Sequence, residues 1–191
     1  MTKARALLPV LCLFALVFVA LFGRDPAVAQ APVRKPIFLA AGEGRHPGAT
    51  PDDTFVFKLG GGESGSTFEV AESRIKPNAG PPLHIHDTED EAFYVVSGTF
   101  RVRVGDQTAE SGPGAFVFAP RGLPHAFVNI GTTDGTLLTL TSPTTFEAFW
   151  QETATASRGL TPGTPEFDKA MAQVLAKHKK RIVGPPLEEK R

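Results

Sequence analysis

Three histidines and one glutamate stand out by their type and spacing. His84 and His86 are two residues apart, Glu91 follows after four intervening residues, and His125 opens a later apolar run. In a strand, side chains two apart point to the same side, so His84 and His86 should share one space. Three imidazoles and a carboxylate suit one divalent transition metal, which could be Fe, Mn, Ni, Co, Cu or Zn. A six-coordinate metal would keep two positions for substrate, water or dioxygen.

Three acids lie in a row at residues 89–91, so the ligand among them needs an argument. Counting back from Gly98, which closes the strand, places Glu91 on the same face as Phe93 and Val95. We therefore expect Glu91 to be both the metal ligand and the catalytic proton acceptor. Glu89 and Asp90 should lie in the preceding loop, either solvated or orienting a ligand.

The same residues fit two longer motifs. The first is His84-x-His86-x4-Glu91-x6-Gly98, and the second is Gly114-x5-Pro120-x-Gly122-x2-His125-x3-Asn129. Together they resemble the two motifs of the cupin superfamily, in particular small bacterial cupins of the quercetin 2,3-dioxygenase-like type. The resemblance implies a jelly-roll barrel with one metal inside. One position departs from the pattern, because Asn78 stands where the family often has Gly, although Asn also tolerates a positive φ.

The elements that must position these residues are short strands separated by turns rich in Gly, Pro and Asp. Apart from the strand carrying His84 and His86, the pattern predicts strands at Thr54–Leu59, Ser66–Ile75, Glu91–Ser97, Phe100–Val104, Ala115–Ala119, His125–Asn129 and Gly135–Thr141. Regularly spaced short strands are typical of an all-β sandwich or barrel. We expect the cupin jelly-roll barrel to occupy residues 54–143.

The barrel should be flanked by two segments of different character. Residues 30–53 are predicted to be an irregular lead-in with one short strand at Ile37–Leu39. Residues 144–191 should be a helical segment that packs on the barrel. Its first helix presents Phe146, Phe149 and Trp150 on one face, and its second starts at Thr164-Pro165, with Thr as N-cap.

Residues 1–29 have the pattern of a signal peptide. A basic start precedes the apolar run Ala6–Phe22, and cleavage is expected after Ala29 or after Ala31. We therefore expect an exported protein, periplasmic or secreted, with no stable membrane anchor after cleavage. The single cysteine, Cys12, lies in the apolar run, so no disulfide can stabilise the mature fold. The balance of 20 basic and 20 acidic residues argues against nucleic acid as a partner.

Strand parity also predicts what lines the pocket. The residues in phase with the ligands are apolar, and the expected lining is Phe93, Val95, Phe100, Val102 and Phe127. Such a lining suits a small organic substrate with one hydroxyl or carbonyl oxygen, although the same side chains could simply fill a small barrel. The leading hypothesis is a dioxygenase-type oxidoreductase that uses dioxygen. The alternatives are a metal-dependent isomerase, lyase or hydrolase, and a non-catalytic binding or sensing module. A homodimer paired through sheet edges is also expected.

Overall fold

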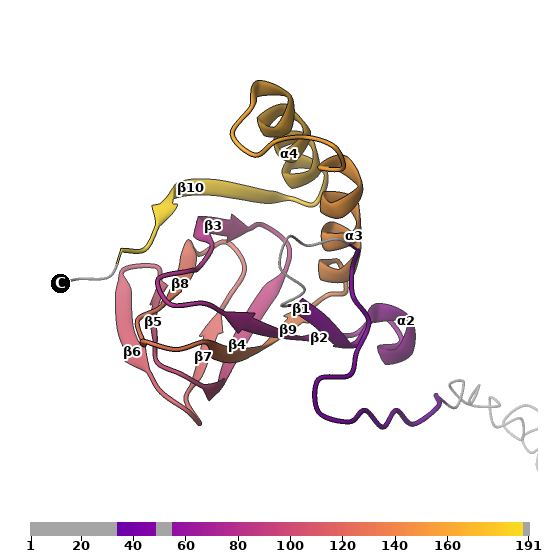
Figure 1. The fold of residues 1–191 in the computed structure, drawn as a ribbon. Coiled ribbons are helices and arrows are strands. Elements are labelled where there is room, and N and C mark those ends of the chain that lie inside the picture. Colours follow the sequence, from indigo (N-terminus) through magenta and orange to yellow (C-terminus); the bar gives the residue numbers. More distant parts are fainter. Residues whose placement is uncertain (1–33, 49–54, 189–191) are drawn as a thin grey trace, which may run out of the picture. The chain divides into compact units, whose positions relative to one another are not determined.

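The computed structural model describes residues 34–48 and 55–188, and two antiparallel sheets dominate this part of the chain (Figure 1). One sheet has the strand order β1-β2-β9-β4-β7, and the other has the order β10-β3-β8-β5-β6. The strands are β1 (Phe55–Leu59), β2 (Glu69–Ile75), β3 (Pro82–His86), β4 (Asp90–Ser97), β5 (Phe100–Val104), β6 (Gln107–Ser111), β7 (Phe116–Ala119), β8 (His125–Asn129), β9 (Gly135–Ser142) and β10 (Lys180–Pro186). This is the all-β jelly roll that the sequence predicts.

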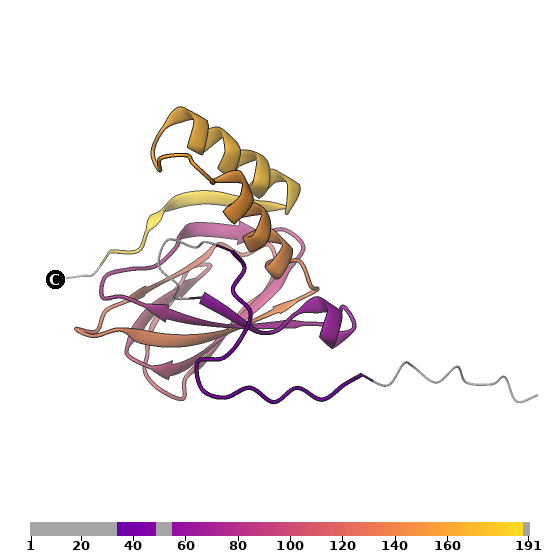
Figure 2. The same cartoon turned by 45° about the vertical axis from the view of Figure 1, so that its right-hand side comes forward.

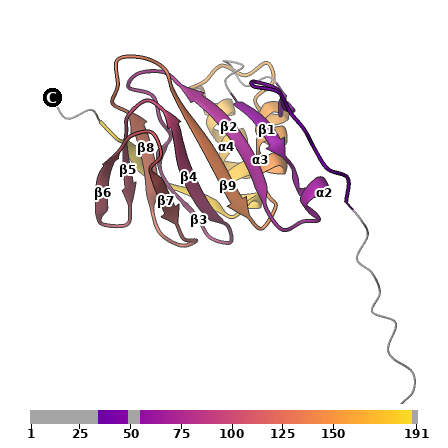
Figure 3. The ribbon, with the colours of Figure 1, turned by 90° about the horizontal axis from the view of Figure 1, so that it is seen from below.

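The core lies between the two sheets, whose strands are seen from below in Figure 3. The first sheet contributes Phe93 and Val95 from β4 together with Leu137 from β9, and the second contributes Phe100 and Val102 from β5. All five side chains are at most 3% exposed. Alternation along β4 and β5 produces this pattern, because every second residue of a strand points inward.

The predicted strands mostly form, with three differences before residue 143. Residues 34–48 contain no helix or strand, so the short strand expected at Ile37–Leu39 is wrong; this stretch makes one isolated bridge, from Arg45 to Phe57. The strand predicted at Ser66–Ile75 begins only at Glu69. The pattern also missed β6, the outermost strand beside β5.

The C-terminal part contains the two expected helices, α3 (Phe146–Ala156) and α4 (Pro165–Lys177), and Figure 2 shows them above the sheets. Thr164 caps α4 as predicted, because its side chain accepts a hydrogen bond from the Phe167 amide. The segment predicted as helical also contains β10, which pairs with β3. Residues 144–191 therefore contribute an edge strand to the barrel as well as helices.

α3 covers a second apolar cluster, at the β1 side of the first sheet. Phe146 packs against Phe55 and Phe57, with ring centroids 5.7 and 6.0 Å away, and Trp150 lies 5.0 Å from Phe55. This contact confirms that the aromatic face of α3 serves packing. A short helix, α2 (Gly61–Ser64), follows β1, where the sequence indicates only a glycine turn.

Two turn positions explain why the motifs need particular residues. Asn78 has φ of 60°, so it takes the left-handed conformation of the family's glycine, as expected. Gly98 has φ of 86° between β4 and β5, and a Cβ there would lie 2.6 Å from the Cα of Gly135. The motif glycine is thus required both by its dihedral angle and by a close approach of backbone.

The predicted signal peptide and both cleavage sites lie outside the described residues. Among the described residues, no helix is both long and apolar enough to cross a membrane.

Candidate metal centre

Three strands bring the four predicted ligands together. β3 carries His84 and His86, β4 carries Glu91, and β8 carries His125, which pairs directly with His84 in the ladder. One potential ligand atom from each residue lies within 4.8 Å of the others. His86, Glu91 and His125 are buried, whereas His84 is half-buried. The cluster could hold a metal ion, and Glu89 and Asp90 are not part of it.

Backbone carbonyls fix the orientation of two of the histidines. The Nδ1 atom of His84 lies 2.8 Å from the Pro82 carbonyl oxygen, and Nδ1 of His125 lies 2.9 Å from that of Leu123. A carbonyl only accepts hydrogen bonds, so each Nδ1 must carry the proton. In their neutral form both rings therefore present Nε2 with a free lone pair, which is the form that binds metals.

The carboxylate of Glu91 lies next to ring nitrogens of two histidines, and one of these, Nε2 of a neutral His125, cannot donate a hydrogen bond to it. Its Oε2 lies 3.0 Å from Nε2 of His125 and 3.5 Å from Nδ1 of His86. In the neutral Nδ1–H form of His125, both Nε2 and Oε2 offer lone pairs, so the contact requires either a shared proton or a cation. The buried Nδ1 of His86 has no hydrogen bond to any described group, although two carboxylates lie near it. The donor set therefore fits a divalent metal.

The stretch that carries the four clustered residues matches a known protein family. The family described as Cupin domain matches residues 71–141, the stretch that contains all four clustered residues. A solved structure from Thermus thermophilus is 31% identical over 41% of this chain and 74% of its own, with a TM-score of 0.40. This chain belongs to the cupin superfamily. The match is to the domain family as a whole, so the likeness of this cupin to the quercetin 2,3-dioxygenase-like type stays a prediction.

Other solved structures similar to this cupin carry different activities in their names. A predicted oxalate decarboxylase from Thermotoga maritima is 22% identical and covers 46% of this chain and 76% of its own, with a TM-score of 0.44. A sugar phosphate isomerase from Silicibacter pomeroyi is 27% identical and covers 47% of this chain and 59% of its own, with a TM-score of 0.40. No curated protein matches the chain.

Burial and the contacts between the clustered residues determine the pKa values at the cupin site. Burial alone would raise the pKa of Glu91, but the hydrogen bond to His125 and the charges of the neighbouring histidines lower it to about 2. Burial, helped by the charge on His125, lowers the pKa of His84 to about 4. Burial, the largest single influence, lowers the pKa of His125, but the hydrogen bond and the charge of Glu91, with the Leu123 carbonyl, together outweigh it and raise this pKa. At neutral pH Glu91 is therefore an anion and His84 is neutral.

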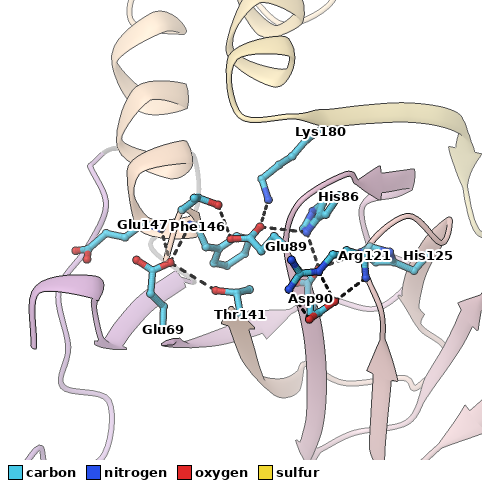
Figure 4. A network of polar contacts seen from close by, with 12 residues as sticks. Glu69, His86, Glu89, Asp90, Arg121, His125, Thr141, Phe146, Glu147 and Lys180 are labelled. Carbon is cyan, nitrogen blue, oxygen red and sulfur yellow. Dashed lines mark hydrogen bonds and ion pairs between the residues drawn. The ribbon is translucent and has the colours of Figure 1, made fainter. Parts of the chain in front are cut away.

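The other two acids of the row have different partners in this cupin (Figure 4). Asp90 is the first residue of β4, so its expected place in the preceding loop is wrong. It accepts hydrogen bonds from the backbone and guanidinium of Arg121, and the ion pair lowers the pKa of Asp90 to about 2. Glu89 is 1% exposed and forms an ion pair with Lys180. Of the two expectations for Glu89, solvation is wrong. Its Oε2 lies 3.2 Å from Nδ1 of His86, and the expectation that it orients a ligand stays a prediction.

The predicted pocket lining is largely filled by its own packing. Phe93, Val95, Phe100 and Val102 are at most 3% exposed and contact one another in the core. Phe127 is half-buried, with its ring 5.4 Å from that of Phe93. Parity correctly placed all five inside the cupin barrel. Among them, only Phe127 is partly exposed, so the other four serve the core.

The two remaining histidines are His46, in the irregular lead-in, and His178, at the basic end of the last predicted helix, and both positions predict solvated surface residues. His46 is exposed as expected. His178 differs, since its side chain is only 10% exposed, with Nε2 lying 2.6 Å from a carboxylate oxygen of Glu152 and its ring packing on Phe149. His178 thus helps to join α4 to α3, and the sequence offered no signal of a partner 26 residues away.

Proposed function

We propose that this cupin is a metal-dependent oxidoreductase of the dioxygenase type that acts on a small organic molecule with a hydroxyl or carbonyl oxygen. The observation that carries the proposal is the convergence of three imidazoles and one carboxylate within 4.8 Å. A bound divalent metal would supply Lewis acidity, which lowers the pKa of a substrate hydroxyl. Four protein ligands leave room in an octahedral shell for two further groups.

The protein's own residues supply charge, orientation and access. Glu91 is ionised at neutral pH, as both a ligand and a proton acceptor must be. A carboxylate with a pKa near 2 is a weak base, so the ligand role of Glu91 is the stronger of the two. His84 and Phe127 are half-buried, so we expect a substrate to approach the site from their side.

A non-catalytic binding or sensing cupin is the alternative function. The close packing of Phe93, Val95, Phe100 and Val102 favours it, because a filled core leaves little space for a bulky substrate. If the protein is an oxidoreductase, the same packing favours a small substrate such as a diketone over a bulkier one such as a flavonol. A metal-dependent isomerase, lyase or hydrolase would use the same ligands without dioxygen.

Metal content by mass spectrometry, followed by oxygen uptake with flavonols, catechols and diketones, tests the proposal. We expect about one equivalent of transition metal per chain and oxygen uptake with at least one member of the panel. Metal without uptake or product would favour the binding module, and conversion without oxygen uptake would favour the isomerase or lyase class.

Removing the metal should destabilise the fold. Only the native barrel assembles all four ligands, so a cation stabilises it by about 2.7 kcal/mol when present at a hundred times its dissociation constant. We expect a chelator to lower the unfolding midpoint and added metal to restore it, as measured by thermal denaturation. His125→Ala should respond to neither treatment, and equal midpoints for chelated and metal-loaded wild type would contradict an internal site.

A further inference from the structure

An ion pair lies buried beside the candidate ligands and is not part of them. Glu89 is 1% exposed and Lys180 is 3% exposed, and the ammonium group of Lys180 donates to Oε2 of Glu89 (Figure 4). Two charges removed from water are costly unless their geometry and further hydrogen bonds compensate. A pair of this kind next to a ligand cluster therefore calls for a reason.

Each member of the pair has a further contact. Oε1 of Glu89 accepts a hydrogen bond of 2.7 Å from the hydroxyl of Thr145, just before α3. The ammonium group of Lys180 lies 5.4 and 5.2 Å from the ring centroids of Phe146 and Phe149. The carboxylate is thus held from two sides by residues of the C-terminal segment.

The carboxylate oxygen that accepts from Lys180 also faces a candidate ligand. Oε2 of Glu89 lies 3.2 Å from Nδ1 of His86, an atom that makes no hydrogen bond to any described group. A small rotation of the ring would complete an Nδ1–H hydrogen bond to Glu89. His86 would then present Nε2 to the metal, as the backbone carbonyls arrange for His84 and His125.

The backbone of β10 also contacts the main chain around His86. Lys180 pairs with His86 across the ladder, and the amide of Asp87 donates to the Lys179 carbonyl at 2.8 Å. One short stretch around the start of β10 therefore fixes both the main chain around His86 and the carboxylate that faces its ring.

We propose that Glu89 and Lys180 form a positioning pair that orients His86 as a metal ligand and thereby couples metal binding to the docking of β10. The inference rests on the proposed metal site. Glu89 accepts the hydrogen bond from His86, and Lys180 holds Glu89 in place and keeps it from ligating the metal itself. Because such coupling is reciprocal, metal binding also strengthens the attachment of β10.

The test uses Co(II) as the probe, with affinity measured by titration and ligand geometry by the visible spectrum. Glu89→Gln and Lys180→Met should each bind Co(II) 10- to 100-fold more weakly, the range typical of residues that support a ligand, with an altered spectrum. The double variant should lose little more than either single variant, since the two residues act as a unit. Lys180→Arg keeps the charge and should recover most of the affinity.

Arg181→Met is the matched control, because it removes a cation from the next position of β10. Arg181 forms an exposed ion pair with Asp87, so its loss should leave affinity and spectrum unchanged. Hydrogen exchange adds a second readout. Co(II) should slow exchange of the β10 amides in the wild type and in Arg181→Met, but much less in Glu89→Gln.

The outcomes separate this inference from the metal site itself. A wild type that binds no Co(II) would contradict the proposed function. A wild type that binds Co(II), with unchanged affinity and spectrum in Glu89→Gln, would overturn only the positioning pair, and so would tighter binding by Lys180→Met. Should Lys180→Met fail to fold, Glu89→Gln decides, because it keeps the size of the side chain and an oxygen acceptor.

Discussion

Glu91→Gln is expected to reduce metal affinity by roughly 100-fold or more, beyond the range typical of supporting residues. The substitution preserves the shape of the side chain but replaces the one anionic oxygen donor of the cluster by a neutral one. Any turnover should fall with it. Metal stoichiometry after dialysis and oxygen uptake measure the two effects, and Glu91→Gln should group with His125→Ala.

Asp90→Asn is the control for this experiment, because it removes the same charge one residue away. Asp90 is engaged by Arg121 and lies outside the cluster, so the metal affinity of Asp90→Asn should stay within about 10-fold of wild type. Loss of metal from Asp90→Asn with retention by Glu91→Gln would place the strand register one residue away from the one described.

Phe146→Ala should lower the free energy of unfolding by about 3–5 kcal/mol. Phe146 is 7% exposed and packs against Phe55 and Phe57, so truncation leaves a cavity between α3 and the first sheet. The same ring also faces the ammonium group of Lys180. Denaturant unfolding of the metal-free protein measures the loss without a contribution from the metal.

Phe118→Ala removes the same number of atoms from β7, where the side chain is 53% exposed. Its effect on the free energy of unfolding should stay within about 0.5 kcal/mol, as for most surface substitutions. Similar losses for both variants would mean that α3 does not pack on the barrel as described.

The residues of the candidate site could be predicted from the sequence because the patterns that mark them are local. Two histidines at strand spacing and one acid in phase with Phe93 and Val95 define an inward face without any knowledge of the fold. Parity also excluded Asp90 from the cluster, whereas Glu89 is in phase with Glu91 and was excluded only by its expected place in the preceding loop. Parity could not show whether an inward residue borders a cavity or fills the core, since that depends on the facing sheet. For this reason most of the predicted pocket lining proved to be packed.

The elements that the sequence did not reveal are stabilised by distant partners. β6 has an exposed polar sequence and depends on β5, so alternation could not mark it. The turn Gly105-Asp106 directly after Val104 was a usable signal, because such pairs favour two-residue hairpins. β10 starts with two basic residues and ends with two prolines. Nothing in this local sequence indicates that it pairs with β3. The role of Lys180 was hidden for the same reason.

The pairing of β10 with β3 also has a kinetic consequence. The contact between Glu89 and Lys180 joins residues 91 positions apart, whereas the hairpin of β5 and β6 closes over a two-residue turn. Contacts between distant segments form late, because the entropy of closing a long loop must be overcome before they stabilise the chain. The surroundings of His86 should therefore be completed in one of the last steps of folding. A chain that captures metal before that step would hold it through an immature site and release it more readily than the native protein.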